Sequence, residues 1–340
     1  MRPNEFRARI LVAMSLATLM LAGCNKEPAP TPEPGERMAV HFLLPGIEGQ
    51  PVVAAAPKGL RTRAALSRYV TVRIVAYRHG SGTPSADSYV TEQTYVADAA
   101  GALTPCTVNT AGDYVADNAS AALMLPGGTY DFYAITPALP LSSDHTSVSV
   151  SHGVDYATSV TDNGGTGFSL SLSDLPAKSI TLKTLQRQCA MIELVVTRDA
   201  SYTAMTALSV NPDGSGVRLS SLSTAPMSAV VGAALVPTPN PSAVSSFTLA
   251  PTAFTQTNTT TASGMVYVLP KVAADLGLSF DLQYTLSGTV TTKSISGKVS
   301  GIVLDAGGSY RFTLTLSAPG ATLTVTDWVD GGTQDNDMGA

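Results

Sequence analysis

Hydrophobic and polar residues alternate along much of the chain from residue 70 onward, with the period of a half-buried β-strand. The clearest stretch is V-T-V-R-I-V-A-Y at 70–77, where every second residue falls on one face. Similar patterns recur, with turn residues such as P-G-G and A-G-G between them, at 128–135, 168–172, 190–196, 278–284 and 310–316. Many short strands with Gly and Pro between them predict an all-β fold made of β-sandwiches, not a parallel α/β fold.

The β-rich body is long enough for two domains. A turn at Leu175-Pro176-Ala177-Lys178 separates two sets of strands of similar total length, so we predict an N-terminal β-sandwich at 64–176 and a C-terminal one at 177–340. Residues 220–263 are dense in Ser, Thr, Ala and Pro, a composition that predicts exposed loops with a short strand or two.

The first 24 residues have the pattern of an export signal. A basic segment precedes an apolar run at 10–21 that is too short for a permanent membrane helix. The run ends in L-A-G-C, which resembles a bacterial lipobox, and Cys24 would then accept a diacylglyceryl group. This pattern predicts a lipoprotein signal at residues 1–24 and a lipid anchor at Cys24. The acyl chains would hold the protein firmly on a membrane, because each buried methylene contributes about 0.8 kcal/mol.

Residues 25–63 begin with a proline-rich spacer, which favours an extended and solvated chain. A short apolar segment with strand-like composition follows at 38–44, and K-G-L-R-T-R-A-A-L lies at 58–66. Two interpretations of this basic cluster are open. It is a solvated loop, or it is a site where an arginine-specific protease cuts between Arg63 and Ala64. In the second case the strand at 38–44 is removable, and its loss would leave an unpaired edge and an apolar groove.

Charge limits the partners. The full sequence has a net charge of −5, and the 12 basic and 20 acidic residues after Arg63 give 12 − 20 = −8 for the body. Nucleic acids need a basic footprint, so we expect no nucleic-acid partner. Cys106 and Cys189 are far apart in sequence, and both a disulfide and two independent buried thiols remain open.

The sequence lacks the motifs of catalysis and of metal binding. It has no G-x-S-x-G, no H-E-x-x-H and no phosphate-binding loop, and the spacing of the four histidines does not fit a zinc site: His41, His79, His145 and His152. We therefore expect no enzyme, no cofactor and no metal centre. Whether the acidic tail binds Ca²⁺ stays open, because four carboxylates occur there without the spacing of an EF-hand: Asp327, Asp330, Asp335 and Asp337.

Several motifs, taken in order, resemble the fimbrillin family, the type V pilins of Bacteroidetes. The first are the lipobox, the proline spacer, the short strand and L-R-T-R-A-A at 60–65. Further motifs extend the resemblance over most of the chain: G-G-T-Y-D-F-Y-A-I (127–135), L-K-T-L-Q-R-Q-C-A-M-I-E-L (182–194), G-G-S-Y-R-F-T-L-T-L (307–316) and L-T-V-T-D-W-V (323–329).

The resemblance implies two transthyretin-like β-sandwich domains in tandem. It also implies export through the periplasm as an outer-membrane lipoprotein, cleavage after Arg63, and assembly with other pilin subunits by strand exchange in an adhesive fimbria. In the family a C-terminal segment fills the groove of the next subunit. Here the candidate donor strand comprises Thr322, Leu323, Thr324, Val325, Thr326, Asp327, Trp328 and Val329.

Other roles for these segments stay open. The candidate donor could instead be the last strand of its own domain, and Tyr310–Leu316 could move with it. The chain runs on into the polar tail D-G-G-T-Q-D-N-D-M-G-A, which a stalk subunit would have to place outside the groove, and this leaves room for a tip or accessory pilin. The sequence does not distinguish stalk, tip and anchor subunits.

A function from another class is a surface lipoprotein that binds glycans or host ligands as a monomer. It would need an exposed platform of aromatic residues, whereas aromatics make up 6% of the chain with a single Trp. The two functions differ in what they predict. The pilin has a protease-sensitive site at Arg63 and strands that pair between subunits, and the monomer has an exposed patch lined by Tyr.

Overall fold

The computed structural model describes residues 37–48, 70–80, 83–98, 100–110, 114–117, 122–171, 177–210, 214–237, 244–317, 321–327 and 333–338. Cys24, Arg63, Ala64, Trp328 and Val329 lie outside these ranges. Met38–Ala340 forms one compact unit.

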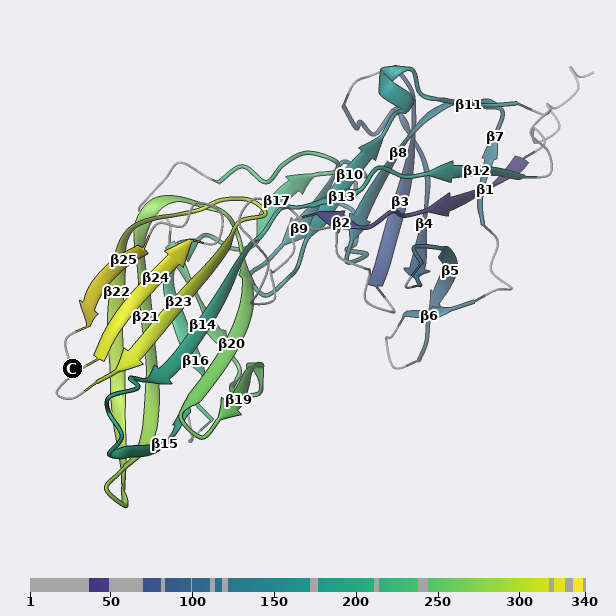
Figure 1. Ribbon diagram of the computed structural model, residues 1–340. Coiled ribbons are helices and arrows are strands. Elements are labelled where there is room, and N and C mark those ends of the chain that lie inside the picture. The colour runs from purple at the N-terminus through teal and green to yellow at the C-terminus, as the bar shows by residue number, and fades with distance from the viewer. Residues whose placement is uncertain are drawn as a thin grey trace, which may run out of the picture. The chain divides into compact units, whose positions relative to one another are not determined.

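The described part of the chain is almost entirely β-structure, which confirms the predicted fold class (Figure 1). All six segments with strand alternation form strands, and the regular elements of the described part that are not strands are two 3-10 turns, η1 (Asn163–Gly165) and η3 (Pro251–Ala253). Gly164 in η1 has a φ of 71°, which is a left-handed conformation. Glycine adopts it without strain, and this explains the N-G-G sequence at the turn.

The first group of strands forms two sheets. One is a three-stranded sheet in the order β12 (Ala177–Thr181), β1 (Arg37–Leu43) and β7 (Leu123–Pro126). The other has nine strands, with β11 (Phe168–Leu170) beside β8 and the remaining strands in this order: β2 (Ile47–Glu48), β13 (Leu185–Arg187), β10 (Ala157–Thr161), β8 (Gly128–Thr136), β3 (Val70–Arg78), β4 (Tyr89–Ala97), β5 (Leu103–Val108) and β6 (Tyr114–Ala116).

The second group also forms two sheets. The six-stranded sheet has the order β19 (Phe254–Asn258), β20 (Thr261–Val268), β14 (Ala190–Arg198), β23 (Ser309–Leu316), β24 (Ala321–Asp327) and β25 (Thr333–Met338). The five-stranded sheet contains β15 (Met205–Val210), β21 (Lys271–Leu286), β16 (Val217–Ser223) and β18 (Val244–Leu249), and β22 (Thr289–Leu304) pairs with β21.

Strand pairing changes partners between β13 and β14. The strands β12 and β13 follow residue 176, yet they pair with β1 and with β2 and β10 of the first group. The first strand that pairs within the second group is β14. The domain boundary after residue 176 therefore stays a prediction. By strand pairing, the first group of strands continues to Arg187, the end of β13.

Each group of sheets encloses its own apolar core, as a sandwich requires. In the first group, β1, β7 and β12 contribute to the same buried cluster as β3, β4 and β8. In the second, strands β14, β20 and β23 pack against β16 and β21. Among these strands, the sequence pattern located β3, β8, β14, β21 and β23, whose hydrophobic and polar residues alternate.

A third buried cluster joins the two groups. The two-stranded sheet of β9 (Ser147–Val150) and β17 (Met227–Val230) pairs antiparallel from Met227↔Val150 to Val230↔Ser147. Met227 and Ala229 are buried there against Tyr133 and Ile135 of β8. The composition predicts exposed loops and edges with a short strand or two at 220–263, and the structure has more strands there than predicted. In β17, Met and Ala at alternate positions suffice to bury one face of a short strand.

His152 lies at this junction and is buried between the two groups of strands. Its Nδ1 accepts the Leu269 backbone N–H at 3.1 Å, so the ring proton is on Nε2. Nε2 lies 2.9 Å from the Ser223 carbonyl oxygen, to which it donates, and 3.0 Å from the Ser245 hydroxyl. Burial lowers the pKa of His152, the positive charge of Lys271 lowers it further, and the Ser223 hydrogen bond opposes both.

These contacts predict that stability falls as the pH drops through and below the ordinary His152 pKa of 6.5. There the unfolded chain binds more protons at this residue than the folded chain, so the free energy of unfolding rises with pH and is lost on acidification. We expect the loss between about pH 7.5 and about pH 5 to be smaller in His152→Gln than in the unmodified protein, as measured by urea unfolding. Equal losses in both proteins would show that His152 does not carry the effect.

Candidate functional site

Strand β1 is the central strand of its sheet, although it comes from the far N-terminal end of the described chain. It pairs in parallel with β12, in a register that runs from Ala39↔Ala177 to Leu43↔Thr181, and it borders β7 on its other side (Figure 1). Its sequence, R-M-A-V-H-F-L, alternates polar or small residues with large apolar ones, which suits a strand with one buried face. A strand in this place is hydrogen-bonded along both edges.

One face of this segment is fully buried. Met38, Val40, Phe42 and Leu44 are 1%, 0%, 5% and 1% exposed and belong to the core of the first sandwich. Residues between them, such as His41 and Leu43, face outward and are exposed. We call the space that these four side chains fill, between β12 and β7, the β1 slot.

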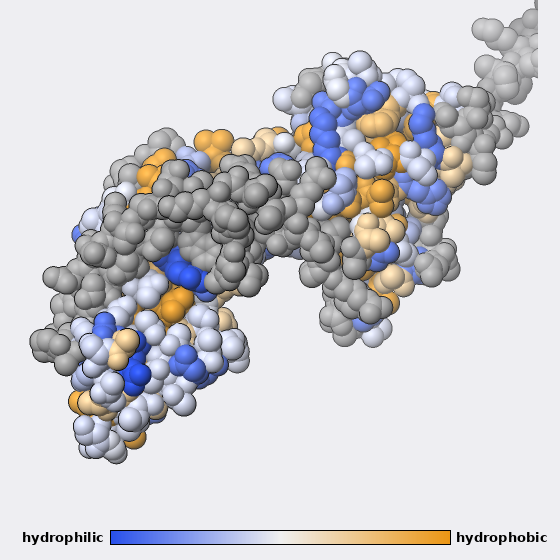
Figure 2. Space-filling model, in the orientation of Figure 1, coloured by the Kyte–Doolittle hydropathy of each residue, from blue (hydrophilic) through white to orange (hydrophobic). Residues whose placement is uncertain are grey.

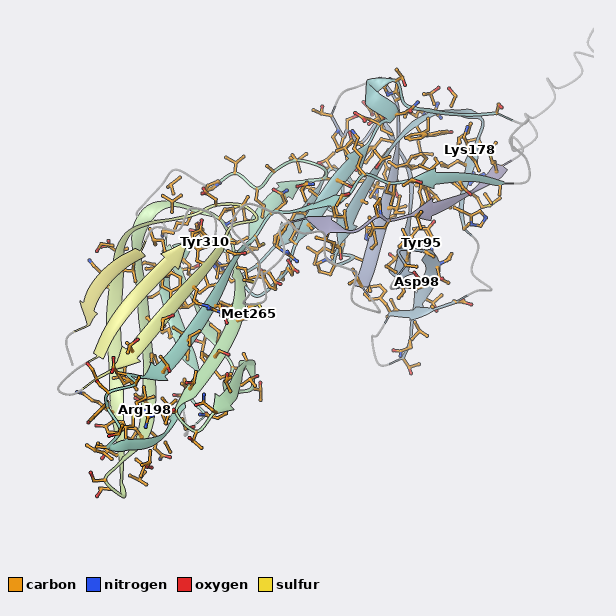
Figure 3. All side chains as sticks on the ribbon, viewed as in Figure 1. Tyr95, Asp98, Lys178, Arg198, Met265 and Tyr310 are labelled. Carbon is orange, nitrogen blue, oxygen red and sulfur yellow. The ribbon has the colours of Figure 1, made fainter. Side chains whose placement is uncertain are left out.

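Aromatic side chains form the deepest part of the β1 slot. The Phe42 ring packs edge-on against Phe132 and Tyr95, with ring centroids 5.1 Å and 5.9 Å away. The Tyr95 hydroxyl accepts the Leu123 backbone N–H at 3.1 Å and so ties β4 to β7 (Figure 3). Burial raises the pKa of Tyr95, which keeps its hydroxyl neutral in this apolar setting.

Backbone hydrogen bonds continue past the end of β1. Leu44 donates its N–H to Gly101 at 2.8 Å, while the Leu43 carbonyl accepts the Leu182 N–H at 2.8 Å. The next strand, β2, pairs in parallel with β13. The segment thus holds to four different parts of the first sandwich, none of them its neighbour in sequence.

Gly101 closes one end of the β1 slot. A Cβ atom there would lie 2.0 Å from the Leu44 carbonyl oxygen, and the φ of 86° is left-handed, so glycine is required for both reasons. Asp98, labelled in Figure 3, shapes the same turn, because its Oδ1 accepts the N–H groups of Ala100 and Ala102 at 2.9 Å each. The turn therefore fits closely around the backbone of Leu44.

The candidate donor strand lies in the other sandwich. Residues 322–327 belong to β24, which pairs antiparallel with β23 from Tyr310↔Asp327 to Leu316↔Ala321. Strand β25 pairs with the other edge of β24, from Ala321↔Met338 to Thr326↔Thr333. The structure thus joins these residues to β23 and β25, and part of the polar tail, which gave no strand signal, is the edge strand β25.

Cys106 and Cys189 are both free and buried, and burial raises the pKa of Cys189 to about 11, so its thiol stays protonated. Within the described ranges, no group of three or more potential metal ligands gathers. None of the helical segments described has the length and hydropathy of a membrane-spanning helix.

The aromatic platform needed for glycan binding is not visible in the described residues. Each described Tyr is buried or half-buried, and so is each described Phe. The large hydrophobic side chains that reach the surface there are aliphatic, such as Val108, Val236 and Met265, and Figure 2 shows such residues interspersed with polar ones. This surface does not favour the monomeric glycan-binding function.

Sequence reasoning found the strand at 38–44 but missed the residues that receive it. Tyr95 belongs to β4 and Phe132 to β8, and their alternation marked them only as core positions. Gly101 sits in A-A-G-A, where its positive φ is not visible from the sequence. No local signal could have linked these three residues to a segment more than fifty positions away.

Comparison with known proteins gives a consistent result. A family model described as fimbrillin-like matches residues 37–331. The chain is similar in structure to a candidate cell adhesion protein from Bacteroides fragilis NCTC 9343, with 18% identity and a TM-score of 0.58 over 86% of this chain and 97% of that chain. At that identity the likeness shows the fold.

Two proteins from Porphyromonas gingivalis also match. The tip fimbrial protein Mfa3 has 9% identity and a TM-score of 0.39, with 88% of this chain and 99% of that chain covered. The fimbrial anchor protein Mfa2 has 11% identity and a TM-score of 0.37, with 87% and 98% covered. A search of curated proteins found no match.

The geometry of the β1 slot predicts a large effect for Phe42→Ala. Because the ring is buried between two other rings, we expect the uncut protein to lose about 3–5 kcal/mol of unfolding free energy. His41→Ala, one position away on the exposed face, is the matched control and should change stability by about 0.5 kcal/mol or less. Urea unfolding measures both, and equal losses from the two changes would contradict the assignment of Phe42 to the core.

Proposed function

We propose, since the chain belongs to the fimbrillin-like family, that it is a fimbrial subunit which joins its neighbours by strand exchange at the β1 slot. Membership of this family makes it a structural protein of the cell-surface fimbria and not an enzyme. The observation that carries the finer proposal is the place of β1, a central strand with four buried side chains at the N-terminal end of the described chain.

Export is the first step of the proposal. The apolar run at 10–21 and the lipobox at Cys24 support passage through the periplasm as a lipoprotein and anchoring in the outer membrane. The proline-rich spacer after Cys24 would hold the folded body away from the lipid surface.

Cleavage after Arg63 is the second step. It would cut the covalent link between β1 and the rest of the body, since β1 and β2 both precede the cut. Hydrogen bonds and the apolar contacts of Met38, Val40, Phe42 and Leu44 would then be all that retains the segment. A strand held only by noncovalent contacts can be replaced by another strand of similar shape.

Replacement of β1 is the third step. An incoming strand would regain hydrogen bonds along both β12 and β7 and refill the four buried positions. On the donor side, β24 is the candidate, with Thr322 to Val329 as the segment that would leave its place beside β23. Sheets completed between chains then hold the fimbria together without covalent bonds.

The test uses Arg63→Ala, with Arg61→Ala as the matched control in the same basic cluster. In the bacterium that makes the protein, we expect Arg63→Ala to accumulate as uncut lipidated precursor and to give no high-mass polymers on gels run without heating. Arg61→Ala should mature and assemble as the unmodified protein does. If the Arg63→Ala protein still matures and enters denaturant-resistant polymers, cleavage at this residue is not the step that opens the slot.

A further inference from the structure

The β1 slot and the last strands of this chain carry different residue patterns. From this mismatch we infer that the slot takes a strand from a different subunit, and that Asp327 prevents copies of this chain from inserting into one another. The inference rests on the proposed strand exchange and adds the identity of the partner.

The occupant of the slot must bring four large apolar side chains at alternate positions. Met38, Val40, Phe42 and Leu44 are all within 5% of complete burial. The side chains that share their hydrophobic cluster include Ile74, Leu125 and the ring of Phe132. The third position is the most demanding, because Phe132 and Tyr95 surround it edge-on and a smaller residue would leave a cavity.

The sequence of the candidate donor does not meet this requirement. In the same chain direction as β1, positions 323, 325, 327 and 329 supply Leu, Val, Asp and Val where the slot holds Met, Val, Phe and Leu. The other face, at 322, 324, 326 and 328, supplies Thr, Thr, Thr and Trp. A shift by two residues brings Ala321 into the slot and leaves Asp327 at its fourth position.

The best of these alignments places the Asp327 carboxylate at the position of Phe42. A carboxylate buried among apolar side chains, without a partner, is strongly disfavoured. The aromatic contacts with Phe132 and Tyr95 would be lost at the same time. In this alignment, Asp327 alone makes the C-terminal strand a poor fit to the β1 slot.

A strand with four large apolar residues at alternate positions does occur in this chain, but it is committed to its own core. In β23, Tyr310, Phe312, Leu314 and Leu316 alternate and are 4%, 3%, 0% and 5% exposed. The strand is paired on both edges, in parallel with β14 and antiparallel with β24. In the chain direction of β1, its aromatic residues fall at the first and second positions and Leu314 at the third. The slot itself calls for a partner strand with four large apolar residues at alternate positions, the third aromatic, in an extended segment.

The test measures binding of labelled peptides to the protein after cleavage at Arg63 and removal of the N-terminal fragment. The probes are residues 37–48, residues 319–330, the second peptide with Asp327→Phe, and the same peptide with Thr326→Phe as the matched control on the other face. We expect the peptide 37–48 to bind and the unmodified 319–330 to bind about a hundredfold more weakly or worse. Asp327→Phe should recover most of the difference, and Thr326→Phe should not.

The outcomes separate this inference from the proposed function. If residues 37–48 do not bind either, no slot is available and strand exchange itself fails. If residues 319–330 bind as tightly as residues 37–48, strand exchange stands and the preference for a different subunit is overturned. If both C-terminal peptides with an added Phe bind equally, the role of Asp327 is overturned.

Discussion

The burial of one face of β1 between β12 and β7 is the contact on which the first sandwich depends. Four large side chains at about 1.5–3 kcal/mol each amount to roughly 6–12 kcal/mol of gross hydrophobic stabilisation, before the entropic cost of ordering the strand. That figure is comparable with the whole net stability of an ordinary domain, about 5–15 kcal/mol. A sandwich without an occupant in this place would therefore be marginal, and an exchange that refills it costs little.

The central position of β1 favours its replacement by another strand over its departure without replacement. Because β1 is central in its sheet, its departure would expose two strand edges, at β12 and at β7, and unpaired edges associate readily with other chains. Two hydrogen bonds that do not involve β1 hold parts of the surroundings: Tyr95 links β4 to β7, and Asp98 shapes the turn at Gly101. Such a slot can discriminate between strands by side-chain pattern, and Phe42 marks the position where discrimination is sharpest.

Much of this architecture follows from the sequence, and the missing part has a physical cause. Alternation located β3, β8, β14 and β23, although β3 and β8 are buried on both faces, and strand-like composition identified the strand at 38–44. It could not give the parallel pairing of β1 with β12, since that register joins residues about 140 positions apart, such as Ala39 and Ala177. It also missed β17, whose buried face consists of Met and Ala, and β25, whose residues are mostly polar. Pairing with a neighbouring strand, not hydrophobicity, defines both elements.

Amide hydrogen exchange of the protein cleaved after Arg63 tests the central claim most directly, with and without the N-terminal fragment. The account predicts that the backbone amides of β7 and β12 lose protection when the fragment is removed and regain it when a peptide of residues 37–48 is added back. Those of β14 and β23, in the other sandwich, should keep their protection throughout. Unchanged protection of β7 and β12 after removal of the fragment would contradict the account, because these strands would then not depend on β1.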